Sequence, residues 1–157
     1  MKLYHIVPQE MRGTILYPLN RMQEVFPEIY EQERQKYAGR EEVAATYIPV
    51  LNCHWVDVVQ MFAVPTHVIQ RRQQLRGGKP LRFFEIESDR LDQFRLCAWL
   101  DDFVLFGPHL PVDRVSPESE ALFERRLREQ GSARLFIYLP HILYQREIDV
   151  SACRIVV

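Results

Sequence analysis

The chain has 157 residues, 47% of them hydrophobic and 26% charged, a balance that predicts one globular domain with a sizeable core. A formal net charge of −1 excludes a broad electrostatic grip on nucleic acid or on an anionic membrane, although it leaves room for a local basic patch. Every apolar stretch ends well short of the ~20 residues that span a bilayer, and no signal peptide is visible.

The first half of the chain predicts one strand and two short helices. Residues 2–7 form the expected strand. Apolar residues recur at helical spacing between positions 19 and 30, but Pro27 interrupts them. Because proline lacks an N–H and clashes with the preceding turn, we place it in the first turn of a second helix. Residues 44–51 are expected to be extended, and both strand and helix remain open for 53–62.

The second half predicts two further helices among strands. Thr66 is the expected N-cap of a helix that Gly77-Gly78 end. Ser116-Pro117-Glu118 is the clearest helix start, since serine caps, proline fits the first turn and glutamate meets the positive end of the dipole. Strands are expected at 81–86, 96–100, 103–106, 134–139, 142–144 and 148–157, with a turn at Asp101-Asp102. Residues 1–157 therefore predict a single α+β domain with a mixed or antiparallel sheet and several short helices.

Cysteine usage predicts neither a disulfide framework nor a metal centre. Cys53, Cys97 and Cys153 are odd in number and far apart, with no C-x-x-C spacing. No H-x-x-x-H or H-E-x-x-H pair exists to anchor a metal. We therefore expect reduced thiols in a cytoplasmic protein, with no metal cofactor and no membrane partner.

Histidines are the strongest candidate site residues. His67, His109 and His141 each follow a proline closely, so we expect them at element boundaries, where sites are commonly assembled. Chance placement in loops is the commoner explanation for any one of them. His5 instead lies within the first strand, on the same face as Leu3. It is either a core residue bonded to a backbone carbonyl or a residue facing a cleft, and both alternatives stay open.

The segment Asn52-Cys53-His54-Trp55-Val56-Asp57 gathers five kinds of functional side chain in six positions. Cys53 and His54 cannot form a catalytic dyad in a strand, because adjacent side chains point to opposite faces. His54 and Asp57 would meet only if the segment is helical. Trp55 is either a stacking platform for a base or a buried core residue.

A basic cluster surrounds the Gly77-Gly78 turn and comprises Arg71, Arg72, Arg76, Lys79 and Arg82. Such a cluster could meet the phosphates of a nucleotide or nucleic acid. The favoured interpretation is a solvated helix face, since no glycine-rich phosphate loop accompanies it.

The opening Leu3-Tyr4-His5-Ile6 resembles the first strand of the ADP-ribosyltransferase superfamily, in the branch of DNA-targeting toxins and poly(ADP-ribose) polymerases. The resemblance implies a nucleotide-binding cleft with NAD as substrate, in which His5 holds the adenosine ribose. It further implies an aromatic residue that stacks the nicotinamide, for which the candidates are Tyr47, Trp55 and Phe62.

The family's late glutamate, which stabilises an oxocarbenium-like transition state, has no match here. His141 stands near the expected position, and Glu147 lies close by but off the motif. A neutral imidazole bonds a ribose hydroxyl but does not stabilise a developing cation as a carboxylate does. Either Glu147 substitutes, or the chemistry differs, or the protein only binds a nucleotide. The resemblance thus implies His141 and Glu147 at the reacting end, with a protein or nucleic-acid target.

Two other classes of function remain open. A non-enzymatic interaction module of the antitoxin, immunity or inhibitor type would carry a sizeable apolar surface patch in place of a polar pocket. A hydrolase would pair a histidine with Asp57 or Asp101.

Overall fold

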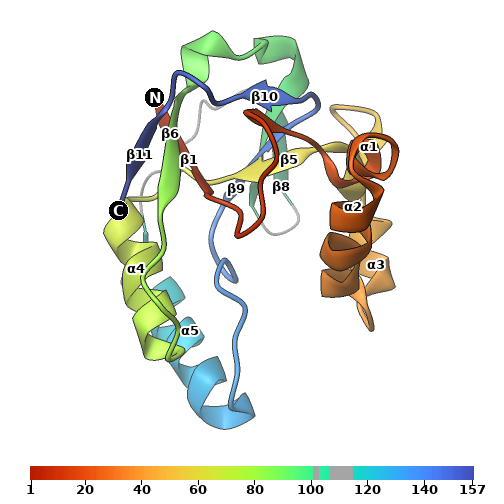
Figure 1. The fold of residues 1–157 in the computed structure, drawn as a ribbon. Coiled ribbons are helices and arrows are strands. Elements are labelled where there is room, and N and C mark those ends of the chain that lie inside the picture. Colours follow the sequence, from red (N-terminus) through yellow and green to blue (C-terminus); the bar gives the residue numbers. More distant parts are fainter. Residues whose placement is uncertain (101–102, 107–114) are drawn as a thin grey trace.

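Two antiparallel sheets form the centre of the molecule in a computed structural model that describes residues 1–100, 103–106 and 115–157 (Figure 1). One sheet has three strands in the order β1-β6-β11, and the other has four in the order β5-β9-β7-β8. The strands of the first span Lys2–Ile6, Phe83–Glu87 and Arg154–Val156, and those of the second Val59–Met61, His141–Tyr144, Leu96–Leu100 and Phe103–Phe106. Two short pairs, β2 with β10 and β3 with β4, complete the strands: Ile15–Leu16, Ile148–Asp149, Tyr47–Ile48 and Cys53–His54.

A single antiparallel bridge between Tyr4 and Phe62 joins the two sheets. The Tyr4 amide donates to the Phe62 carbonyl at 2.8 Å, and the Phe62 amide returns the bond at 3.0 Å. His5 directly follows this bridge on β1, where the strand pairs on its other side with β6. The bridge therefore links β1 to the residue that follows β5.

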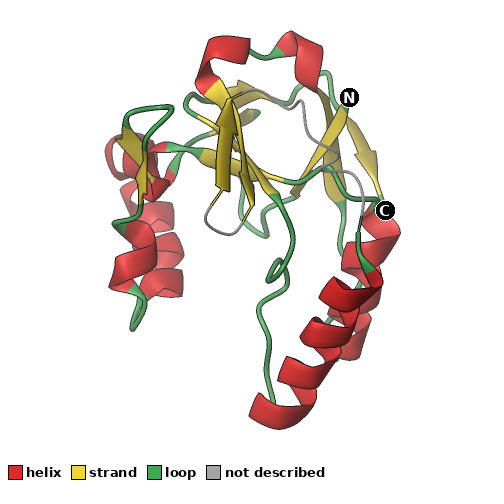
Figure 2. Ribbon diagram, turned by 180° about the vertical axis from the view of Figure 1, so that it is seen from behind, coloured by secondary structure: helices red, strands yellow, loops and turns green. Residues whose placement is uncertain are grey.

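Within the described residues, five α-helices lie on two sides of the sheets (Figures 1 and 2). The short helices α1, α2 and α3 group on one side, and α4 and α5 lie together on the other. Their bounds are Leu19–Val25, Pro27–Arg34, Glu41–Ala44, Thr66–Leu75 and Pro117–Gln130. The 3-10 helices η1 to η4 span Gln35–Tyr37, Trp55–Asp57, Ser88–Arg90 and Gln93–Arg95. None of the helices in the described ranges has the length and apolar character to cross a membrane.

Three apolar clusters hold these layers together. Between the two sheets lies a central core that includes Leu3, Phe84 and Ile142. On the far side of the three-stranded sheet, Ile69 of α4 packs with other apolar residues on Phe83. On the far side of the four-stranded sheet, the β3–β4 hairpin and η2 cover Cys97 and Leu143. Strand alternation produces this arrangement, since successive side chains enter different layers.

Most predicted elements are confirmed, and the molecule is an α+β domain as the sequence indicates. Pro27 starts α2, and Ser116 caps α5 by accepting a hydrogen bond from the Ser119 amide at 3.1 Å. The helix ends at Gly131, whose φ of 72° is left-handed. The strands predicted at 96–100 and 103–106 have the predicted bounds. Asp101-Asp102 and His109 lie outside the described residues.

Four local predictions are wrong. Residues 148–157 form two strands, Ile148–Asp149 and Arg154–Val156, because the chain turns at 151–152. Residues 134–139 form turns, because side chains of α4 and α5 bond the carbonyls that a strand would use in a ladder. Residues 44–51 are not continuously extended, since α3 runs to Ala44 and the chain turns after Ile48. Thr66 is not the N-cap of α4 but its first residue, and its hydroxyl donates to the Val157 carbonyl at 3.2 Å.

Candidate functional site

Aromatic rings gather around His141, at the start of β9. Trp55 of η2 contacts the imidazole with ring centroids 5.6 Å apart, and Phe136 contacts it at 6.1 Å. Trp99 of β7 pairs with His141 in the sheet and lies 5.7 Å from Trp55. All four rings are half-buried, so each keeps part of its surface accessible. We call these four residues the ring cluster.

His141 is uncharged at neutral pH. Burial lowers its pKa from 6.5 to about 4, although a hydrogen bond to the Leu139 carbonyl opposes the shift. The rings of Trp55 and Phe136 contact its imidazole and contribute to this desolvation. A neutral imidazole in this position offers hydrogen bonds to an uncharged ligand group.

His5 has the same electrostatic character. Burial lowers its pKa to about 4, a bond to the Ile6 carbonyl raises it, and nearby Lys36 lowers it. Its Nδ1 lies 2.7 Å from the Ile6 carbonyl oxygen. A neutral ring that donates from Nδ1 keeps Nε2 as an acceptor for a hydroxyl group. Of the two roles that the sequence leaves open, His5 combines the backbone bond of the first with a half-buried side chain that suits the second.

The 3-10 helix η1 connects His5 to the ring cluster. Lys36 lies within electrostatic range of His5. The next residue, Tyr37, faces Trp55, and burial raises its pKa while the Trp55 side chain lowers it through a hydrogen bond. Glu33 at the end of α2 influences both His5 and Tyr37. It is therefore a carboxylate close to both parts of the site.

A polar cleft of about 540 Å³ lies beside η2. Its lining consists of Pro18, Asn20, Arg21, Asn52, Cys53, Asp57, Gln145, Arg146 and Glu147. Asp57 is held in place, since Asn20 and the His54 amide both donate to its carboxylate at 2.9 Å. Glu147 is exposed, and no ion-pair partner for it lies among the described residues.

The structure brings only some of the predicted site residues together. Trp55 and His141 are in contact. Glu147 lies beyond the opposite end of β9 from His141, in the polar cleft. Tyr47 is 48% exposed on the β3–β4 hairpin, where its hydroxyl donates to Asn52. Phe62 is 2% exposed and packs among other rings of the core.

The remaining candidates have distinct outcomes. Residues 55–57 are helical, and His54 Nδ1 accordingly lies 3.9 Å from Asp57 Oδ2. Cys53 is a core residue, and burial raises the pKa of its thiol to about 11. His67 is exposed on α4. Asp101 lies outside the described residues. Within the described ranges, no three His, Cys, Asp or Glu side chains are grouped to hold a metal ion.

The prediction that the basic cluster forms a solvated helix face is wrong at Arg72. Arg71 is exposed and forms ion pairs with Glu120 and Glu124 of α5. Arg72 is fully buried instead of lying on a solvated helix face. Helical spacing accounts for the difference, because Arg72 lies three residues after the buried Ile69 and so faces the same side.

Four residues near the site carry no strong sequence signal: Glu33, Tyr37, Trp99 and Phe136. Phe136 lies in the segment 134–139, which is predicted to be a strand, and Trp99 lies in the predicted strand 96–100. Only the pairing of β7 with β9 places Trp99 beside His141.

Comparison with family models, with curated proteins and with solved structures finds no match to this chain.

Proposed function

We propose that this protein binds a nucleotide, with NAD as the leading ligand, between His5 and the ring cluster. The observation that carries the proposal is the contact of Trp55 with His141 among half-buried rings. Accessible aromatic faces suit a flat base, since stacking contributes about 1–3 kcal/mol per base. Neutral histidines suit the hydroxyls of a ribose.

In this arrangement each residue has a separate role. His5 accepts a hydrogen bond from a ribose hydroxyl through Nε2. Trp55 stacks on the base or nicotinamide, and His141 bonds a polar group at the same end. Tyr47 and Phe62 take no part, because one lies on the exposed hairpin and the other is closed within the core. The three free cysteines favour a reducing compartment, so we place the protein in the cytoplasm.

The proposed reaction is transfer of ADP-ribose from NAD to a protein or nucleic-acid target, as the resemblance of residues 3–6 implies. Breaking the bond between nicotinamide and ribose requires a carboxylate near the developing cation. Two candidates exist: Glu147 in the polar cleft, and Glu33 near His5. Binding has more support than transfer, since neither carboxylate contacts a ring of the cluster.

Calorimetric titration with NAD, ADP-ribose and AMP tests the binding. We expect wild type to bind NAD, and His5→Ala and His141→Ala each to weaken binding about tenfold, the value of one neutral hydrogen bond. His67→Ala is the matched control, because it removes an exposed histidine of α4 that belongs to neither part of the candidate site.

Two results would overturn the proposal. One is the absence of heat and of any thermal shift with all three ligands at about 1 mM, a concentration that detects even weak affinity. The other is equal binding by His5→Ala and His67→Ala. If His5 served only the core, its replacement would lower the unfolding free energy by about 1–3 kcal/mol without a specific change in affinity.

Release of nicotinamide from NAD separates the two carboxylates. If Glu147 supports transfer, Glu147→Gln abolishes release and Glu33→Gln retains it. The opposite pattern assigns the role to Glu33. Binding of NAD without release by wild type would restrict the function to nucleotide binding.

The alternative interaction module is favoured by one feature, the outer strand of the three-stranded sheet. β11 is the last strand in that sheet, and Ile155 is 50% exposed while Val157 is 77% exposed. Edge strands with exposed apolar side chains are common docking sites for other chains. A double variant, Ile155→Lys with Val157→Lys, would abolish association with a protein partner while leaving NAD binding intact.

A further inference from the structure

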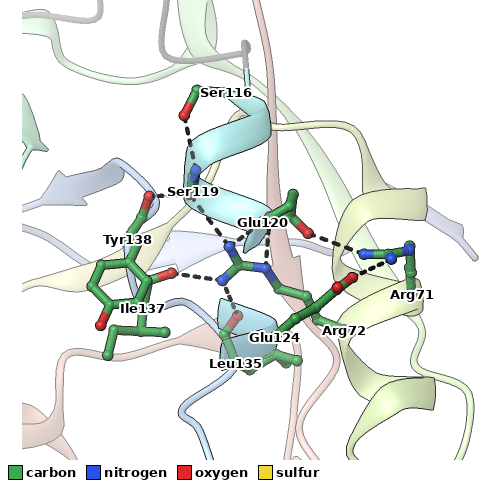
Figure 3. Close-up of polar contacts among 9 residues, drawn as sticks. All are labelled: Arg71, Arg72, Ser116, Ser119, Glu120, Glu124, Leu135, Ile137 and Tyr138. Atoms are coloured by element: carbon green, nitrogen blue, oxygen red, sulfur yellow. Dashed lines mark hydrogen bonds and ion pairs between the residues drawn. The ribbon is translucent and has the colours of Figure 1, made fainter. Parts of the chain in front are cut away.

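Arg72 lies fully buried between α4 and α5 (Figure 3). Its guanidinium donates to Glu120 Oε1 from Nε at 2.9 Å and from Nη2 at 2.6 Å. It also lies 4.4 Å from the centre of the Phe123 ring. Burying a charge is costly unless its hydrogen bonds are satisfied, so the remaining donors show what else the residue does.

Those donors bond the turn segment 134–139. Arg72 Nη1 donates to the carbonyl of Leu135 at 3.0 Å and to that of Ile137 at 2.6 Å. Ser119 donates to the next carbonyl, that of Tyr138, at 2.7 Å. One arginine and one serine therefore hold three carbonyls within four residues.

The segment requires this support because its backbone is strained. Tyr138 has a φ of 63°, a left-handed conformation that side chains other than those of asparagine or aspartate rarely adopt. Such conformations persist where the surroundings fix them. Here the surroundings are the bonds from Arg72 to Ile137 and from Ser119 to Tyr138 itself.

The same segment builds one wall of the ring cluster. Phe136, between the two carbonyls that Arg72 bonds, contacts His141 and Phe62. The Leu139 carbonyl, which follows Tyr138, raises the pKa of His141 through a backbone hydrogen bond, against the effect of burial. The orientation and surroundings of His141 thus depend on a turn that Arg72 holds from behind.

We propose that Arg72 is a positioning residue for nucleotide binding, which acts by fixing the 134–139 turn and, through Phe136 and Leu139, the His141 ring. This inference rests on the proposed function for its consequence in binding. Its geometric part concerns only the turn and His141, and can be measured without a ligand.

The test uses Arg72→Lys, which keeps the charge but lacks the planar fork that reaches Glu120 and two carbonyls together. Nuclear magnetic resonance on the full chain reports ring-to-ring contacts between Phe136 and His141 and the titration of the imidazole. We expect the contacts to weaken, the pKa of His141 to rise from about 4 towards 6.5, and NAD affinity to fall about tenfold.

Arg71→Lys is the matched control, since Arg71 shares the helix and the partner Glu120 but bonds no carbonyl of the turn. It should leave the ring contacts and the His141 titration unchanged. If Arg72→Lys does not fold, Ser119→Ala loosens the same turn with a smaller loss of contacts and should move both readings in the same direction.

Unchanged ring contacts and an unchanged His141 titration in a folded Arg72→Lys protein would overturn the inference, as would equal changes in Arg71→Lys. Failure of wild type to bind any nucleotide would refute the proposed function separately. In that case the resonance measurements still decide whether Arg72 positions His141.

Discussion

Arg72 and His141 are both ionisable residues, but their surroundings differ: Arg72 is fully buried and His141 is half-buried. Arg72 has a carboxylate, two carbonyls and an aromatic face around it. His141 has aromatic neighbours and one carbonyl, and its pKa falls to about 4. The fold thus surrounds the Arg72 guanidinium with hydrogen-bond partners. His141 is neutral because the effect of burial on its pKa outweighs that of its one backbone hydrogen bond.

This contrast separates a structural role from a binding role. A buried group whose bonds are all made has none left for a ligand, whereas a half-buried neutral ring with an unused nitrogen does. His5 belongs with His141 by this criterion, since its Nδ1 is bonded to Ile6 and its pKa is also about 4.

The largest expected effect comes from removing the charge of Arg72. Arg72→Met should lower the unfolding free energy by about 3–5 kcal/mol, because Glu120 then loses its closest cation and the Leu135 and Ile137 carbonyls lose their donor. Urea denaturation measures the change. Adding Glu120→Leu should recover part of the loss, and a double variant no more stable than the single one would contradict this account.

Acidification tests the other side of the comparison. The pKa of each histidine is about 4 in the folded chain and about 6.5 when unfolded, so the unfolded state binds more protons between these values. Stability is therefore full above pH 6.5 and falls as the pH drops towards 4. At 1.36 kcal/mol per pKa unit, the protonation of each histidine lowers the unfolding free energy by roughly 3 kcal/mol over this pH range.

The measurement is the unfolding free energy of wild type and of His5→Ala at pH 7 and pH 4.5. The variant should lose less stability on acidification than wild type does. Equal pH dependence in the two proteins would show that His5 titrates normally.

The smallest expected effect comes from the neighbour of Arg72. Arg71→Ala removes exposed ion pairs to Glu120 and Glu124 and should cost less than about 1 kcal/mol. Thermal unfolding of this variant beside Arg72→Met compares two adjacent arginines on one helix. Similar losses of stability in the two variants would show that buried Arg72 and exposed Arg71 do not differ in their contribution to folding.

Local signals in the sequence were sufficient for much of the fold. Proline and capping residues set the starts of α2 and α5, since these depend on neighbours within one turn. Strands of alternating or continuously apolar residues, such as β7, were equally accessible. Such elements are predictable because their causes lie within a few residues.

The site was less accessible because its causes are remote in the chain. His5 and Trp55 were identified as candidates, but their relation to His141 depends on sheet pairing and on η1. The burial of Arg72 depends on Glu120 and on carbonyls more than sixty residues away. Spacing from Ile69 places Arg72 on the inner face of α4, but the residues near position 72 do not show which partners would satisfy its charge.

The strand order of the three-stranded sheet has a consequence for how the chain folds. Central β6 pairs with β1 from the beginning of the sequence and with β11 from its end. Neither partner is local, so this sheet gains its hydrogen bonds only after long loops have closed. We expect helix α4, which lies just before β6, to form early, and β11 to add last. The rate of folding would then be limited by the closure of these long chain segments.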